Sequence, residues 1–457
     1  MPLSLRLRLG TMMLLQYAIP GAFAPVAYIY WLSLGFSNSQ IVDMGILGGV
    51  IGLVSPFIGG QIADRWVPTQ YYLAAANIVG AVILVLMGIR HDYLTILLLS
   101  GVYALLVGPT GPLTNSLAFH HLKDAAREFG SIRVWGTIGW IIAGLGLTLW
   151  RHLYDVAFVS LLADFRLDLA WLGDLWRLWW SPSARSLGGD LFFVAGGCSL
   201  ALGLFSLALP STPPARQGVN PLAFLEALKL LKDRHFAIFL GIAFVVTTEL
   251  SFYYTPTSKF LKDLGIAEAN VPSVMTIAQI AEIFVLALLL PLATRKIGLK
   301  WTLALGVIAW PLRYVIFAIG QPLWLVVAAL AFHGFGFAFF FVASQIYVNN
   351  VAHSDIRASA QSLLAVALGI GGLLGGYIFN FVINVFTYGP ARDVWPFMKP
   401  VYAAIKSYLG TDAGPGTVTE WTYLFLFPCA LTSLCAVAYL ILFKPPREQL
   451  AAQETPA

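Results

Sequence analysis

Twelve runs of mainly apolar residues, each long enough to cross a lipid bilayer, dominate this sequence of 457 residues. A helix that spans the hydrocarbon core needs about 20 such residues. Lipid offers no water to backbone N–H and C=O groups, so only helices or closed barrels satisfy them there. Runs of this length predict helices. The expected spans are residues 9–33, 40–63, 70–89, 93–119, 131–150, 190–210, 236–258, 272–294, 300–319, 322–348, 358–385 and 421–443.

The low charge content predicts an integral membrane protein rather than a soluble enzyme. Charged residues make up 11% of the chain, whereas a soluble domain carries about 25%. The net charge of +5 comes from Lys and Arg in the loops between apolar runs, so it indicates topology and not affinity for nucleic acid. The sequence contains no paired-histidine metal motif, no nucleophile elbow and no phosphate-binding loop. We therefore expect neither an enzyme nor a bound cofactor, and no soluble output domain of a sensor fits in the chain.

The distribution of basic residues predicts the orientation in the membrane. Lys and Arg accumulate in cytoplasmic loops. With the N-terminus inside, the short outer loops carry only Arg90, Lys259 and Lys262, whereas most other basic residues fall in inner segments. An even number of spans then places both termini in the cytoplasm.

The longest inner connection divides the chain into two sets of six spans. We expect an all-α membrane protein with twelve transmembrane helices in two six-helix bundles. The predicted parts are an N-terminal bundle over 1–210, a cytoplasmic linker over 211–235, a C-terminal bundle over 236–443 and a cytoplasmic tail over 444–457.

Two long outer segments interrupt the predicted bundles, at 151–189 and 386–420. The first is rich in tryptophan and has too many charges for a span, which is typical of a helix lying at the membrane interface. A packing or lid role remains an alternative for both segments. The tryptophans are Trp171, Trp176, Trp179 and Trp180.

Ionisable residues inside the predicted spans mark a candidate polar site. Glu282 is the only ionisable residue between Pro272 and Thr294. A charge at mid-bilayer costs roughly 2.5–3.5 kcal/mol, so such residues usually face a wet cavity or a partner. Gln279 lies one turn earlier on the same helix face. The pair is suited to holding a polar solute, and Glu282 is also a candidate proton-binding group.

Two further charged residues lie in the spans of the second half. Glu249, in span seven, is a second candidate for proton coupling. Arg313, in span nine, either neutralises a carboxylate or contacts solute. His333, in span ten, is a possible proton relay or a packing residue.

Span five presents polar and aromatic groups on one face. Arg133, Thr137 and Trp140 recur at i, i+4 and i+7, a spacing that places them together on a helix. A guanidinium, a hydroxyl and a large ring suit a solute with hydroxyls and a flat π surface. The alternative is that Arg133 caps the inner helix end and Trp140 fills a helix interface.

Several motifs resemble those of one transporter family. The segment 60–65 (GQIADR) follows span two and resembles the signature loop of the major facilitator superfamily. Residues 132–139 (IRVWGTIG) resemble the span-five signature of the nucleoside:proton symporter family within that superfamily. The block with Gln279 and Glu282, the pattern at 309–313 and residues 356–361 (IRASAQ) agree with it.

This resemblance implies proton-coupled nucleoside uptake by alternating access. It carries over Arg133, Thr137, Gln279 and Glu282 as positions of the central site. Structural or gating roles are expected for a second set: Gly60, Asp64, Arg65, Arg313 and Arg357.

The sequence departs from the family pattern in two spans. Ser251 and Tyr254 stand where nucleoside carriers of the family have amide side chains, and both are included in the expected substrate site. Residues 337–339 (FAF) stand where they have an acidic residue. The alternative is therefore a carrier of the same fold for a different polar aromatic or sugar-like solute, in import or in export.

The expected partners follow from the same resemblance. They are a nucleoside-like solute, protons and membrane lipid, with no nucleic acid. We expect a monomer in a bacterial inner membrane.

Overall fold

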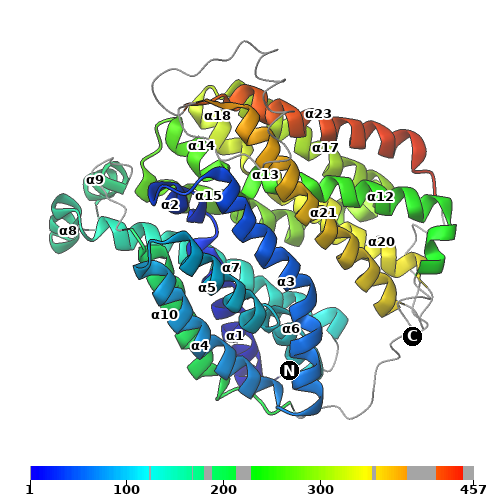
Figure 1. The fold of residues 1–457 in the computed structure, drawn as a ribbon, viewed down its shortest axis with the longest axis horizontal. Helices are drawn as coiled ribbons and strands as arrows, with labels where there is room; N and C mark the ends of the chain where they lie inside the picture. Colours follow the sequence, from blue (N-terminus) through cyan, green and yellow to red (C-terminus); the bar gives the residue numbers. More distant parts are fainter. Residues whose placement is uncertain are drawn as a thin grey trace. The chain divides into compact units, whose positions relative to one another are not determined.

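A computed structural model of the chain describes residues 2–122, 125–166, 168–179, 188–212, 228–352, 357–388 and 418–445. Within these residues, 11 helical segments are long and apolar enough to cross a membrane. The helix Asp190–Ser206 is apolar but shorter, with 17 residues. All twelve predicted runs are therefore helical (Figure 1).

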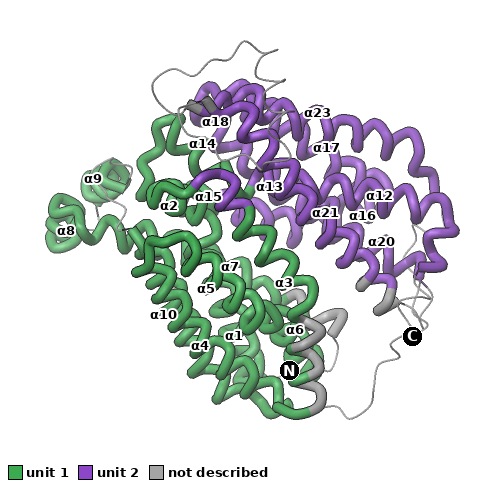
Figure 2. The backbone as a smooth tube through the Cα atoms, viewed as in Figure 1, with its two compact units in different colours: residues 1–36, 43–217, 254–276 green, residues 37–42, 218–253, 277–457 purple. Residues whose placement is uncertain are grey.

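The chain forms two compact units (Figure 2). Unit 1 comprises Met1–Phe36, Asp43–Gln217 and Tyr254–Thr276, and unit 2 comprises Ser37–Val42, Gly218–Tyr253 and Ile277–Ala457. These bounds differ from the predicted bundles, which follow the order of the chain.

Unit 1 consists mainly of the first helices of the chain. Its helices are α1 (Leu3–Phe23), α2 (Ala27–Ser33), most of α3 (Asn38–Arg65), α4 (Thr69–Ile89), α5 (Tyr93–Val107), α6 (Thr110–His121), α7 (Ala125–His152), α8 (Val156–Ala163), α9 (Leu169–Trp179), α10 (Asp190–Ser206) and α14 (Thr257–Asp263), together with the 3₁₀ turn Glu268–Asn270. Helix α15 (Val271–Phe284) begins in unit 1 and ends in unit 2.

Unit 2 holds the remaining helices and a small ribbon of two strands. They are the 3₁₀ turn Leu228–Lys232, α12 (Arg234–Thr248), α13 (Leu250–Tyr254), the π-helical turn Val285–Leu289, α16 (Leu290–Lys296), α17 (Gly298–Ile319), α18 (Leu323–Ala329), α19 (Phe332–Gly336), the π-helical turn Phe337–Val342, α20 (Ala343–Val351), α21 (Arg357–Val385), β1 (Thr387–Tyr388), β2 (Val418–Thr419) and α23 (Trp421–Leu442). The strands pair antiparallel, with Thr387 opposite Thr419. They lie at the two ends of the predicted outer loop 386–420, most of which falls outside the described residues.

Polar contacts explain why Tyr254–Thr276 belongs to unit 1. Thr148, near the end of α7, accepts a hydrogen bond from the Ser273 backbone N–H at 3.2 Å. His152 Nε2 lies 2.9 Å from Asn270 Oδ1. Arg151 Nη1 donates to the Glu268 carbonyl at 3.3 Å. These bonds fix the start of α15 to the end of α7.

The tryptophan-rich insertion forms the two helices α8 and α9. The Trp171 indole N–H donates to the Leu161 carbonyl at 3.0 Å and thereby joins α9 to α8. Phe158 and Trp179 stack on the His152 ring at 4.9 and 5.3 Å between centroids. The insertion therefore packs against the end of α7. Trp180 lies outside the described residues.

Candidate functional site

The packing of α1 against α7 positions the polar face of span five. A Cβ added at Gly139 would lie 2.0 Å from the Leu14 carbonyl oxygen, and one at Gly21 would lie 2.7 Å from the Trp140 Cα. Only glycine permits such a close approach of the two backbones. The approach holds Arg133 over the Tyr17 ring, with 3.9 Å from Cζ to the centroid.

Arg133 lies well inside α7, which begins at Ala125, so the capping alternative for this residue does not apply. Its guanidinium instead makes a cation–π contact, an interaction worth about 0.5–2 kcal/mol. Thr137 is 8% exposed and Trp140 is half-buried. The structure thus places Arg133, Thr137 and Trp140 on α7. Tyr17, whose ring contacts Arg133, was not predicted from the sequence.

Helix α15 carries the second predicted pair. Gln279 and Glu282 are 7% and 8% exposed. Within the described part of the chain, Gln279 Oε1 is a buried acceptor with no hydrogen-bond partner. A π-helical turn, Val285–Leu289, follows directly after this polar segment; such turns are frequent at functional sites.

Helix α19 fits tightly against the same segment of α15. A Cβ added at Gly334 would lie 2.5 Å from the Glu282 backbone nitrogen and 2.6 Å from the Ala281 carbonyl carbon. Glycine at this position therefore fixes how α19 and α15 approach each other around Glu282.

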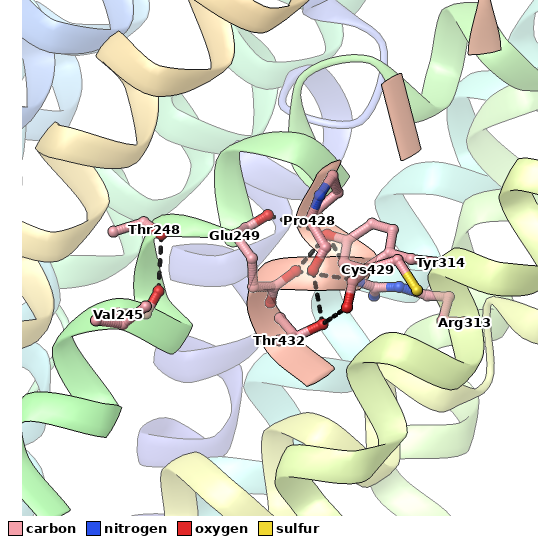
Figure 3. A network of polar contacts seen from close by, with 8 residues as sticks. All are labelled: Val245, Thr248, Glu249, Arg313, Tyr314, Pro428, Cys429 and Thr432. Atoms are coloured by element: carbon pink, nitrogen blue, oxygen red, sulfur yellow. Dashed lines mark hydrogen bonds and ion pairs between the residues drawn. The ribbon is translucent and has the colours of Figure 1, made fainter. Parts of the chain in front are cut away.

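The two charged residues predicted in spans seven and nine form a buried pair in unit 2. Arg313 Nη2 lies 3.3 Å from Glu249 Oε2, and both side chains are 0% exposed. The Tyr314 hydroxyl also contacts Glu249 Oε2, and it lies 3.1 Å from Arg313 Nη2. Figure 3 shows the three side chains converging. Arg313 thus neutralises a carboxylate, the first of the two alternatives drawn from sequence.

Aromatic rings surround the Arg313 guanidinium. Its Cζ lies 4.1 Å from the Tyr253 ring centroid, 4.6 Å from that of Trp310 and 4.7 Å from that of Tyr314. His333 stacks on Tyr253 at 4.9 Å between centroids. Cation–π attraction is strongest where the cation is desolvated. The surrounding rings therefore stabilise the guanidinium charge of Arg313 in the membrane interior, where a lone charge would be unfavourable.

The remaining predicted residues stand in different places. Ser251 Oγ lies 3.5 Å from the Gly372 carbonyl oxygen, and Tyr254 is half-buried at the end of α13. The surroundings of four further predicted residues lie outside the described part of the structure, so their roles stay predictions. They are Gly60, Asp64, Arg65 and Arg357.

The sequence matches the profile of the family described as Nucleoside H+ symporter over residues 2–162 and 186–448. The chain belongs to this family. The putative nucleoside transporter YegT of Escherichia coli (strain K12) is 28% identical over 454 residues, 97% of this chain and 95% of that protein. The nucleoside permease NupG of the same strain is 27% identical over 434 residues, 89% of this chain and 94% of that protein.

Solved structures show the same fold. The crystal structure of the nucleoside transporter NupG has a TM-score of 0.72 and 23% identity, covering 97% of this chain and 100% of that chain. A bacterial homolog of the human lysosomal transporter Spinster has a TM-score of 0.65 at 17% identity. These likenesses confirm the predicted all-α membrane fold, and the match to the Nucleoside H+ symporter family confirms the predicted transporter class. The protein is an integral membrane transporter.

The family profile omits residues 163–185. The omitted segment holds α9 and the end of α8, so most of the tryptophan-rich insertion is a feature of this chain beyond the family profile.

Proposed function

We propose that this protein carries a nucleoside together with protons and binds the solute through polar side chains of its membrane-spanning helices. The observation that supports this most is the match to the nucleoside H+ symporter family over nearly the whole chain, combined with Gln279 and Glu282 buried in a membrane-spanning helix. The YegT and NupG relatives are named as nucleoside transporters.

The chemistry of the residues fits a nucleoside. Ribose hydroxyls both donate and accept hydrogen bonds, so a carboxylate at Glu282 and the unpartnered Gln279 oxygen complement them. Arg133 and Thr137 supply donors for base or ribose oxygens. The Trp140 ring offers a surface for stacking on a base, a contact worth about 1–3 kcal/mol.

We further propose alternating access of a monomer in a bacterial inner membrane, with both termini cytoplasmic. The scarcity of Lys and Arg in the short outer loops supports the orientation of the termini through the positive-inside rule, and the bacterial relatives support the inner membrane.

Uptake of labelled uridine and adenosine into cells lacking their own nucleoside carriers tests the proposal. Wild type should accumulate label, and a protonophore should abolish the accumulation. Glu282→Gln should also abolish it, because the amide cannot replace the charge. Asp174→Asn, an exposed carboxylate of α9 outside the family profile, should transport as wild type does. Absence of uptake by correctly inserted wild-type protein would refute nucleoside import.

A second cargo class is favoured by Ser251 and Tyr254, which offer hydroxyls in place of amides. A polar aromatic or glycosidic solute matches them better than a base that needs amide contacts. Competition of unlabelled glycosides and aromatic solutes against uridine uptake separates the classes, since a better substrate inhibits at lower concentration than uridine itself. Export would appear as efflux from preloaded cells.

A further inference from the structure

We propose that Glu249 is the carboxylate that carries the proton during transport, and that Arg313 and Tyr314 are the partners that replace the proton once it leaves. The inference rests on the proposed function, since it concerns the proton half of that symport. It separates two roles: Glu282 serves the solute, and Glu249 serves the proton.

The first support is the position of Glu249 in the middle of span seven. It lies between α12, which ends at Thr248, and α13, which begins at Leu250, and its backbone keeps right-handed helical torsion angles. The Glu249 carbonyl accepts hydrogen bonds from the Phe252 N–H at 2.9 Å and from the Tyr314 hydroxyl at 3.0 Å. Ionisable residues at such depth in transporters commonly mark proton pathways.

The second support is the incomplete bonding of the buried pair. Contacts reach Oε2 of Glu249, whereas Oε1 has no hydrogen-bond partner among the described residues, and neither do Nε and Nη1 of Arg313. A permanent structural ion pair needs its remaining lone pairs and protons satisfied to offset desolvation. This pair leaves a carboxylate oxygen open for a proton.

The third support is that Arg313 can remain in place when the carboxylate becomes neutral. The rings of Tyr253, Trp310 and Tyr314 hold the guanidinium within 4.7 Å of their centroids. The Glu249 side chain thus alternates between two arrangements: a neutral acid beside the arginine cation, and a carboxylate paired with that cation. Two discrete arrangements of one group are what a coupling element requires.

Other ionisable groups face the pair from the helices packed around it. Tyr253 on α13 and His333 on α19 stack on each other, and Glu282 on α15 acts electrostatically on Tyr253. Helix α23 contributes Cys435, which interacts with Glu249. Helix α21 packs against α12 through glycine, with the Gly375 Cβ position 2.2 Å from the Thr248 carbonyl oxygen.

The proton balance of the cycle is simple. Glu249 accepts one proton from the outer solution and becomes a neutral acid, while Arg313 stays on the aromatic rings. After the change of access it releases the same proton to the inner solution, and the carboxylate pairs again with Arg313. No other bond forms or breaks.

Purified protein in liposomes tests the inference with labelled uridine. Counterflow, measured without a pH gradient, reports solute binding and the change of access. Accumulation, driven by an alkaline interior, reports proton coupling. A gradient of one pH unit supplies about 1.4 kcal/mol per coupled proton, and a tenfold concentration ratio of uridine stores the same free energy. One coupled proton therefore supports about tenfold accumulation. Wild type should show both activities, as should the control Asp174→Asn.

The decisive variant is the double substitution Glu249→Gln/Arg313→Gln, since Glu249→Gln alone leaves an unpaired buried arginine and risks misfolding. The double variant should retain counterflow. It should not concentrate uridine above the outer level, and the addition of uridine should not make the medium more alkaline. Tenfold accumulation by the double variant would overturn the inference alone and assign the pair a structural role. Loss of both activities in a folded double variant would also overturn it. Absence of counterflow by wild type would overturn the proposed function and the inference with it.

Discussion

Removing one partner of the buried ion pair between α7 and α10 is expected to destabilise unit 1 strongly. Arg151 Nε and Nη2 donate to the two carboxylate oxygens of Asp190, each at 2.8 Å. Both side chains are 2% exposed. Asp190→Asn keeps the size of the side chain but leaves the arginine charge buried without its counter-charge.

The structure sets the size of the expected effect. Removing one partner of a buried pair costs about 3–5 kcal/mol. The exposed pair of Arg177 with Asp174, whose side chains are 77% and 41% exposed, provides the comparison, since such pairs contribute about 0.2–1 kcal/mol. Asp190→Asn should therefore lower the free energy of unfolding several-fold more than Asp174→Asn.

Equilibrium unfolding in mixed detergent micelles measures both free energies. The double variant Arg151→Met/Asp190→Leu should recover most of the loss, because apolar replacement of a whole buried pair is often neutral or stabilising. If Asp190→Asn lowers the free energy of unfolding no more than Asp174→Asn does, the loss of the counter-charge is not felt as that of a buried pair, and the prediction is refuted.

Three further predictions follow from other contacts. Gly334→Ala should lower the free energy of unfolding by roughly 1–3 kcal/mol, since its Cβ would overlap the backbone of α15 and overpacking costs that much. Gly241→Ala should leave the free energy of unfolding unchanged, because its Cβ would meet nothing within 4 Å. Tyr17→Leu removes the ring under Arg133 and should raise the KM for uridine in uptake assays severalfold. Hydrogen bonds from the first turn of α5 lower the pKa of Asp92 from its usual 3.8, so its contribution to stability exists at neutral pH and is lost as the pH falls below that value. The difference in unfolding temperature between wild type and Asp92→Ala should accordingly shrink in acid, whereas a constant difference would contradict the assignment.

The helical spans were predictable because each needs only a local signal, a long apolar run. The ionisable residues within them were predictable for the same reason, since Glu249 and Arg313 stand out against apolar neighbours. Their pairing was not predictable. It depends on how Glu249 of span seven meets Arg313 of α17 in the folded unit, which no local pattern encodes, and the nearby Tyr314 looks in sequence like any aromatic residue of a span.

The end of α7 shows the converse limit. Arg151 falls just beyond the predicted span, in a segment with many charges, and the sequence therefore assigns it to the outer segment expected at the membrane interface. The structure extends α7 to His152 and buries Arg151. Its counter-charge is Asp190, at the far end of the insertion, so the pairing depends on how the insertion returns to the bundle and not on local composition.

The irregular backbone of unit 2 coincides with its polar residues. Helix α12 gives way to α13 at Glu249, a π-helical turn follows Glu282, and another begins directly after α19, which carries His333. The Glu249 carbonyl accepts hydrogen bonds from the Phe252 N–H at 2.9 Å and from the Tyr314 hydroxyl at 3.0 Å. The same hydroxyl also contacts the Glu249 carboxylate. A change in the charge of Glu249 therefore acts on a hydroxyl that also bonds the backbone of span seven, which couples protonation to the backbone at this point.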